Sequence, residues 1–248
     1  MNDEQLLRYS RHVLLPQIDV QGQDTICQGK VLVLGVGGLG SPVAMYLTAS
    51  GVGEIALVDD DVVDESNLQR QIIHQQQNVG INKTESAKVL LNGLNPGCEI
   101  RTFEHRLDEA ELERILPEYN VVVDCTDNAE SRYALNMASL KTLTPLVSGA
   151  AIRFEGQVSV FDPRDNTSPC YQCLYDALGT QQLACAESGV FSPLVGVIGS
   201  MQALEALKLL AGLSSGLVGK VALFNGFKNS WQYLGLNKNT RCSACSSR

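Results

Sequence analysis

Two pairs of cysteines with the spacing of metal ligands stand far apart in the chain. Cys170 and Cys173 form one C-x-x-C pair, and Cys242 and Cys245 form the other. Together they supply four thiolates, which is the ligand set of a tetrahedral structural zinc site. Because four sulfurs leave no open position on the metal for water, we expect this zinc to attach the C-terminus to the rest of the protein and to take no part in catalysis.

A glycine-rich segment predicts a nucleotide site. Gly35, Gly37, Gly38 and Gly40 lie between an apolar run and a helical pattern, and Asp59 ends the next apolar run. In such a βαβ unit the glycines permit a tight turn against phosphates, the helix N-terminus supplies N–H donors, and the acid binds ribose hydroxyls. The pattern predicts adenine-nucleotide binding without naming the nucleotide. The alternative is that the glycines serve only helix–strand packing.

Charged residues downstream favour ATP over a dinucleotide. Arg70 and Lys83 can neutralise phosphates, and Asp127, just beyond a predicted strand, offers a hard oxygen ligand for magnesium. The carboxyl ends of parallel strands converge on one crevice, so these side chains are expected to meet there. Each of them alone could be an ordinary surface charge, but together they favour a triphosphate with a metal ion.

A further cysteine, Cys185, lies in the polar stretch from Gly179 to Gly189. An accessible thiol there could act as a nucleophile, although a single loop cysteine is more often inert. From these residues alone, both interpretations remain open.

The elements that position these residues follow from hydrophobic patterning. Strands are expected at 31–34, 54–59, 99–103, 121–124, 146–148, 157–161, 220–225 and 231–236. Helices are expected at 3–15, 39–50, 83–94, 108–116, 130–140 and 194–211. The alternation predicts an α/β fold: a Rossmann-like, doubly wound, mostly parallel sheet with an elaborated C-terminal half. We expect one domain over 1–248, with an N-terminal helical segment (1–28), a nucleotide-binding half (29–150) and a half that carries the zinc site (151–248).

Composition excludes several classes of protein. The 248 residues carry 19 Lys and Arg against 27 Asp and Glu, a net charge of −8, which argues against nucleic-acid binding. The first residues lack the apolar core of a secretory signal, so a cytoplasmic location is expected. The longest apolar stretch, Pro193 to Gly212, contains Gln202, Glu205 and Lys208, which favours a buried helix over a membrane span.

The motifs taken together resemble one known family. They are Gly35 to Gly40, Ser66 to Arg70, Lys83, Asp124 to Asn128, the two cysteine pairs, and Cys185 to Val190. This combination is similar to that of the bacterial adenylyltransferases that activate ubiquitin-like sulfur-carrier proteins in molybdopterin and thiamine biosynthesis, which are relatives of the ubiquitin-activating enzymes. The resemblance runs from Leu7 to Cys245 and therefore covers almost the whole chain.

The resemblance implies roles for individual residues. It places the glycine turn on the phosphates, Asp59 on the ribose, magnesium on Asp127, and Asn128 beside the nucleotide. It places the triphosphate at Asn67, Arg70 and Lys83, and it adds Ser66, Leu68 and Gln69 to the nucleotide-binding residues. Arg11 would reach into a neighbouring subunit's site, which implies a homodimer, and Cys185 matches the cysteine of the family's crossover loop. Asn82 stands where relatives often carry proline before the lysine.

The implied reaction is attack of a carrier's C-terminal glycine carboxylate on the α-phosphate of ATP, which gives an acyl-adenylate and pyrophosphate. The carrier would end in Gly-Gly, and a persulfide-bearing partner would supply sulfur, because we expect no rhodanese domain after Arg248. The stretches 147–157 and 185–190 favour the molybdopterin carrier over the thiamine carrier. An NAD-dependent oxidoreductase and a non-catalytic zinc-stabilised scaffold remain as alternatives from other classes.

Overall fold

The computed structural model describes residues 1–178 and 189–247 and contains one eight-stranded mixed sheet. The strands are β1 (Lys30–Leu34), β2 (Glu54–Val58), β3 (Glu99–Phe103), β4 (Val121–Asp124), β5 (Leu146–Ile152), β6 (Glu155–Phe161), β7 (Lys220–Asn225) and β8 (Ser230–Gly235). Their order is β3-β2-β1-β4-β5-β6-β7-β8. Pairing is parallel from β3 to β5 and antiparallel from β5 to β8. The predicted doubly wound α/β fold with an elaborated C-terminal half is therefore confirmed.

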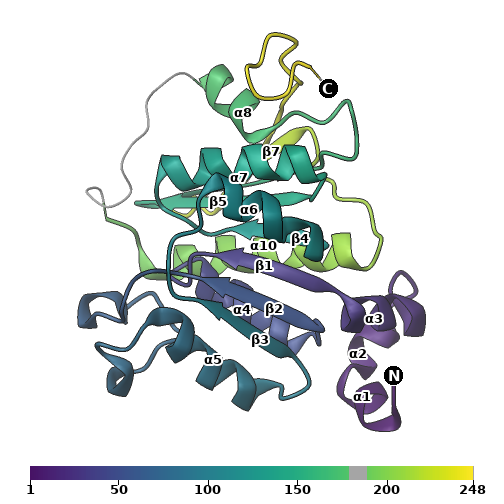
Figure 1. The fold of residues 1–248 in the computed structure, drawn as a ribbon, viewed down its shortest axis with the longest axis vertical. Coiled ribbons are helices and arrows are strands. Elements are labelled where there is room, and N and C mark those ends of the chain that lie inside the picture. The colour runs from purple at the N-terminus through teal and green to yellow at the C-terminus, as the bar shows by residue number, and fades with distance from the viewer. Residues whose placement is uncertain (179–188, 248) are drawn as a thin grey trace.

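Helices cover both faces of the sheet because its central strands are apolar on both sides (Figure 1). Along β1, Val31 and Val33 face one core and Leu32 and Leu34 face the other. The first core includes residues of α3 (Asp19–Gln28), α4 (Gly40–Ala49), α5 (Lys83–Leu94) and α10 (Ser192–Leu210). The second includes residues of α6 (Glu109–Ile115), α7 (Ala129–Thr142) and α8 (Tyr171–Leu178). Burial on both faces explains why these strands are nearly continuous apolar runs.

The element limits differ from those predicted at a few places. The segment expected to be one helix over 3–15 is two short helices, α1 (Asp3–Arg8) and α2 (Ser10–Val13), separated at Tyr9. The C-terminal half contains α8 in addition to the single helix expected there, α10. Short 3-10 turns also occur at Glu65–Asn67, Gln76–Asn78 and Leu116–Glu118. None of these differences alters the order of the sheet.

The N-terminal helices pack at the end of the sheet where the parallel strands begin. The ring of Tyr9 fills the space beside Gly51, since a Cβ at that glycine would lie 2.3 Å from the ring. The Tyr9 hydroxyl accepts a hydrogen bond from Asn95 Nδ2 at 2.9 Å. Gly51 and Asn95 precede β2 and β3, so α1 and α2 lie opposite the carboxyl ends of these strands. Figure 1 shows α1, α2 and α3 together at the lower right.

One helix, Ser192–Leu210, is long and apolar enough to cross a membrane by length and composition alone. In the fold it is a core helix, since Leu194, Ile198 and Ala206 contribute to the first core. Its Glu205 is also buried and is paired with Lys208 at 2.8 Å. The prediction of a buried helix at this stretch agrees with this packing.

Candidate nucleotide site and four-cysteine cluster

A cavity of about 450 Å³ opens at the carboxyl ends of the parallel strands, and this volume is typical of a small-molecule site. Segments that are far apart in the sequence meet there. The predicted site residues that line it are Gly35, Gly37, Gly38, Asp59, Gln69, Arg70, Lys83, Asp127 and Asn128. The cavity therefore combines a glycine turn, two cations and two carboxylates.

The glycine turn joins β1 to α4 and has little space for side chains. Gly35 has a positive φ of 88°, and a Cβ there would lie 2.6 Å from the carbonyl oxygen of Cys125. A Cβ on Gly40 would lie 1.9 Å from the Gly35 carbonyl oxygen. Gly40 is not among the lining residues, so in this structure it serves the close packing of the turn against the helix.

His74 supports the glycine turn from behind and was not predicted from the sequence. Its Nε2 lies 2.9 Å from the Val36 carbonyl oxygen, and its Nδ1 lies 2.9 Å from Ser86 Oγ. A carbonyl oxygen can only accept, so Nε2 carries the proton, and in the neutral ring Nδ1 accepts from the serine hydroxyl. Burial lowers the pKa of His74, which favours this neutral form.

Asp59 lies at the end of β2 beside the glycine turn. Its carboxylate accepts hydrogen bonds from the backbone N–H of Val36 at 2.7 Å and of Asp61 at 3.0 Å. Burial raises the pKa of this carboxyl group, while the Lys83 charge and the two backbone donors act in the opposite direction. The Lys83 side chain is only 6% exposed, and its ammonium is paired with Asp61 at 2.7 Å. The lysine is therefore already held at the cavity by a carboxylate.

Asp124, the last residue of β4, and Asp127, just after the strand, differ in how their carboxylates are used. Asp124 is buried and accepts hydrogen bonds from Thr126 and Ser148. Arg132 lies 3.7 Å from it and also donates to the carbonyl oxygen of Thr126. Burial lowers the pKa of the Arg132 guanidinium, but Asp124, Tyr171 and Tyr175 together outweigh it, so the pKa is raised. Asp127 is exposed in the cavity, and within the described residues no hydrogen bond or ion pair occupies its carboxylate.

Other predicted residues take different positions. Asn128 lines the cavity, but its side chain caps α7 by accepting from the Ser131 N–H at 2.9 Å. Arg70 donates to the carbonyl oxygen of Ser66 at 3.3 Å. Ser66, Asn67 and Leu68 do not line the cavity.

Arg11 is exposed on α2, away from its own chain's cavity. Cys185 lies outside the described residues, so its predicted role stays a prediction.

The cavity also contains polar residues that the sequence analysis missed. They are Asp60, Asp61, Gln71, Thr126, Ser131, Arg106 and Arg132. Gln71 is 4% exposed, and its Oε1 has no hydrogen-bond partner among the residues that the structure describes. A usable signal existed for the aspartates and the glutamine, because each lies within two residues of a predicted site residue. Arg106 had no such signal, since its place depends on β3 lying next to β2.

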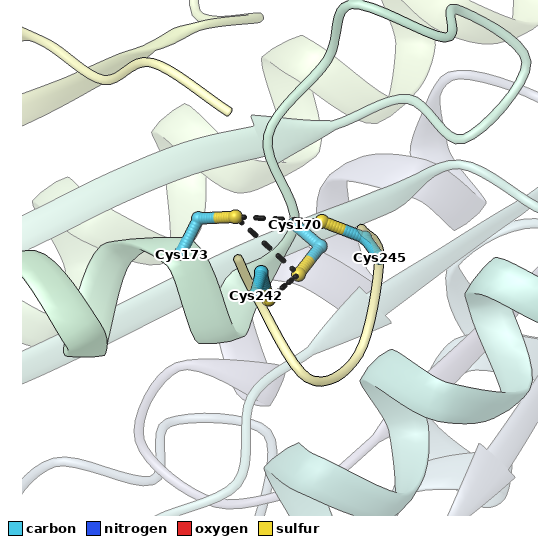
Figure 2. Close-up of side chains that lie close together, drawn as sticks. All are labelled: Cys170, Cys173, Cys242 and Cys245. Carbon is cyan, nitrogen blue, oxygen red and sulfur yellow. Dashed lines mark hydrogen bonds between the residues drawn. The ribbon is translucent and has the colours of Figure 1, made fainter. Parts of the chain in front are cut away.

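The four predicted zinc ligands come together at one buried point. Figure 2 shows the sulfur atoms of Cys170, Cys173, Cys242 and Cys245 gathered around a common centre. Sulfur–sulfur distances are 3.8 Å for Cys170–Cys173, 3.7 Å for Cys170–Cys242 and 3.5 Å for Cys173–Cys245. Four Zn–S bonds in a tetrahedron place the sulfurs roughly 3.8 Å apart, so the cluster fits zinc. Burial raises the pKa of Cys170 to about 12, a cost that a bound cation would offset.

Comparisons with known proteins agree with this geometry. The ThiF family model matches residues 9–244. The molybdopterin-synthase adenylyltransferase of Escherichia coli is 42% identical over 245 residues, covering 99% of this chain and 98% of that protein. An adenylyltransferase and sulfurtransferase of Drosophila sechellia is 39% identical; the match covers all of this chain and 55% of that one. The crystal structure of E. coli MccB with AMPCPP and MccA has a TM-score of 0.83 and 25% identity, covering 96% of this chain and 74% of that one.

Proposed function

The chain belongs to the ThiF family, and from that membership we propose that it uses ATP to adenylate the C-terminal glycine of a ubiquitin-like sulfur-carrier protein for molybdopterin synthesis. The resemblance predicted from the motifs is thus confirmed. The observation that supports the proposal most directly is the convergence of nine predicted residues on one cavity of nucleotide size. Full-length similarity to molybdopterin-synthase adenylyltransferases favours that carrier over the thiamine carrier.

Within the cavity, each group has a role that follows from its position. The glycine turn and the N-terminus of α4 would hold the phosphates, and Asp59 would bind the ribose hydroxyls. Arg70 and Lys83 would stabilise negative charge on the phosphates as the carrier carboxylate attacks the α-phosphate and pyrophosphate leaves. No general base is required, because the attacking carboxylate is already ionised. Catalysis therefore depends on positioning and on charge neutralisation.

Asp127 is the residue proposed to hold magnesium. Its carboxylate is exposed in the cavity, whereas that of Asp124 is committed to the fold. Magnesium usually binds through one or two carboxylates together with substrate phosphates and water, and this site offers that arrangement. Bound there, the ion would neutralise charge on the triphosphate.

The position of Arg11 supports a composite site made by two chains. In its own chain Arg11 lies on α2, at the opposite end of the parallel strands from the cavity. It can contribute to catalysis only if it reaches the cavity of a second copy, as the family resemblance implies. We therefore propose a homodimer with two sites, each completed by the partner subunit's arginine.

Three further features complete the proposal. The cysteine cluster would hold a structural zinc, which requires reduced thiols and fits a cytoplasmic enzyme. Adenylation makes the glycyl carbonyl electrophilic, and the outer sulfur of a persulfide-bearing protein would attack it and displace AMP, which leaves an acyl disulfide. A thiol, such as that of Cys185, would then attack the donor-side sulfur of this disulfide, which releases the carrier thiocarboxylate and forms a new disulfide with the donor.

The test combines the purified protein with ATP, magnesium and either the molybdopterin or the thiamine carrier. Pyrophosphate release together with an AMP-sized mass increase on the molybdopterin carrier is the expected result. Modification of the thiamine carrier alone would move the proposal to that carrier. If neither carrier is modified, the proposal that the protein adenylates one of these two carriers is overturned.

Asp127 and Arg11 are tested by variants and by mixing. Asp127→Ala should lower the rate of magnesium-dependent adenylation by about a hundredfold or more. Glu99→Ala should not lower this rate, because Glu99 is the first residue of β3 and does not line the cavity. Co-expressed Arg11→Ala and Asp127→Ala chains should recover about a quarter of wild-type activity, because half the dimers are mixed and each mixed dimer has one intact site. No recovery would contradict the shared site.

A further inference from the structure

The order of the strands fixes where a purine base must lie, provided that the proposed function is correct. Phosphates at the turn after β1 and a ribose at Asp59 after β2 place the nucleotide across these two strand ends. The next strand in the sheet on that side is β3. The backbone N–H of Asp59 donates to the Phe103 carbonyl oxygen at 3.1 Å, so the segment after β3 lies directly beside Asp59. The base therefore lies against the residues that follow Phe103.

Two residues of that segment, Arg106 and Leu107, line the cavity. Leu107 is buried and contributes to the second core, so it forms a fixed apolar wall together with Val58 at the end of β2. The Arg106 side chain is about half exposed, and its Nη2 lies 3.7 Å from Asp60 Oδ2. A planar cation paired with a carboxylate thus lines the same cavity as the apolar residues Leu107 and Val58.

From this arrangement we propose that Arg106 is a nucleotide-binding residue that stacks its guanidinium on the purine base, with Leu107 on the apolar side. A guanidinium is flat and weakly hydrated, so it stacks on aromatic faces more readily than an ammonium does. Arg70 and Lys83 differ from it, because they serve the phosphates. Arg106 would therefore contribute to affinity for the base and leave the chemical step unchanged.

The experiment separates contact with the base from general attraction to phosphate. Binding of ATP, AMP and inorganic tripolyphosphate is measured by calorimetry on the wild type, Arg106→Leu, Arg106→Lys and a control, Arg114→Leu. Arg114 is an exposed arginine in the last turn of α6 and does not line the cavity. Steady-state adenylation of the carrier gives the KM for ATP and the kcat of each variant.

Arg106→Leu should lower the affinities for ATP and AMP by a similar factor, about three- to tenfold, and should leave the affinity for tripolyphosphate unchanged. The KM for ATP should rise while kcat stays within about twofold of wild type. Arg106→Lys should recover only part of the loss, since it restores the charge without the flat surface.

Four results would overturn the inference. In the first, Arg106→Leu lowers the affinity for tripolyphosphate as much as the affinity for ATP, which would show that Arg106 attracts phosphate. In the second, Arg106→Lys restores the full affinity for ATP, which would show that only the positive charge matters. ATP and AMP affinities unchanged in Arg106→Leu, in a preparation that adenylates the carrier normally, would refute the base contact while leaving the proposed function intact. A wild type that neither binds ATP nor adenylates a carrier would overturn both.

Discussion

Removal of the His74 imidazole tests whether the glycine turn depends on the side chain behind it. His74→Ala takes away the partner of the Val36 carbonyl oxygen and of the Ser86 hydroxyl, both of which are bonded to the ring at 2.9 Å. Each buried polar group left without a partner costs about 1–3 kcal/mol, and the lost packing of the ring adds about 1 kcal/mol. We therefore expect a loss of about 3–7 kcal/mol, a large part of the 5–15 kcal/mol that typically stabilises a domain.

The same bonding scheme predicts a dependence on pH. Because burial lowers the pKa of His74, the native protein holds this ring neutral while the unfolded chain protonates it near pH 6.5. Stability from this group is therefore fully present above pH 6.5 and is lost as the pH falls through the lower native pKa. The loss should approach 1.4 kcal/mol per pH unit for one proton. His74→Gln, which can still donate to Val36, should lose this part of the pH dependence.

The assay is urea denaturation at pH 7.5 and 5.5, with His105→Ala as the control. His105 is also a histidine, but its side chain is 59% exposed. The control should stay within about 0.5 kcal/mol of wild type. Two outcomes would refute the reasoning: a cost below about 1 kcal/mol for His74→Ala, or parallel losses in wild type and His74→Gln between the two pH values.

Three further variants test other parts of the structure. Gly40→Ala should weaken ATP binding in calorimetry by about tenfold or more, because its Cβ would lie 1.9 Å from a carbonyl oxygen of the glycine turn. The control Gly93→Ala should leave ATP binding unchanged, because a Cβ at Gly93 would meet open space. Tyr9→Phe should lower the free energy of unfolding by about 1 kcal/mol through loss of its bond to Asn95, and an unchanged denaturation midpoint would contradict this. Cys245→Ser should lower the amount of bound zinc measured by mass spectrometry, and it should lower the melting temperature by about 10 °C or more. A variant that has lost its zinc but melts at the wild-type temperature would show that the metal is not structural.

The parallel part of the fold was predictable because burial on both faces leaves a continuous apolar signal. Val31 to Leu34 and Val121 to Val123 are such runs, and the structure places both as neighbouring central strands. The N-terminal helices were harder to predict, since α3 buries Gly22 and the polar Gln23 and shows only a weak apolar stripe. Tertiary packing, which a local pattern does not encode, decides such segments.

Residues of the site were predictable where they belong to a motif and not where they depend on strand order. Asp59 and Lys83 were found from their place after a strand and before a helix. Arg106 was missed because only the pairing of β3 with β2 brings it to the cavity. His74 was missed for a similar reason, because its partners Val36 and Ser86 come from separate segments. Local spacing identifies the ends of elements, and the sheet decides which ends meet.

The cysteine cluster also has a consequence for synthesis of the protein. Its first pair, Cys170 and Cys173, is made well before the second pair, Cys242 and Cys245, which lies far downstream. A ribosome must therefore release the chain past Cys245 before four thiolates can surround one metal ion. Any chain cut short before Cys242 keeps only half of the ligands and holds zinc weakly. Retention of zinc thus distinguishes a chain that extends past Cys245 from one that stops before Cys242.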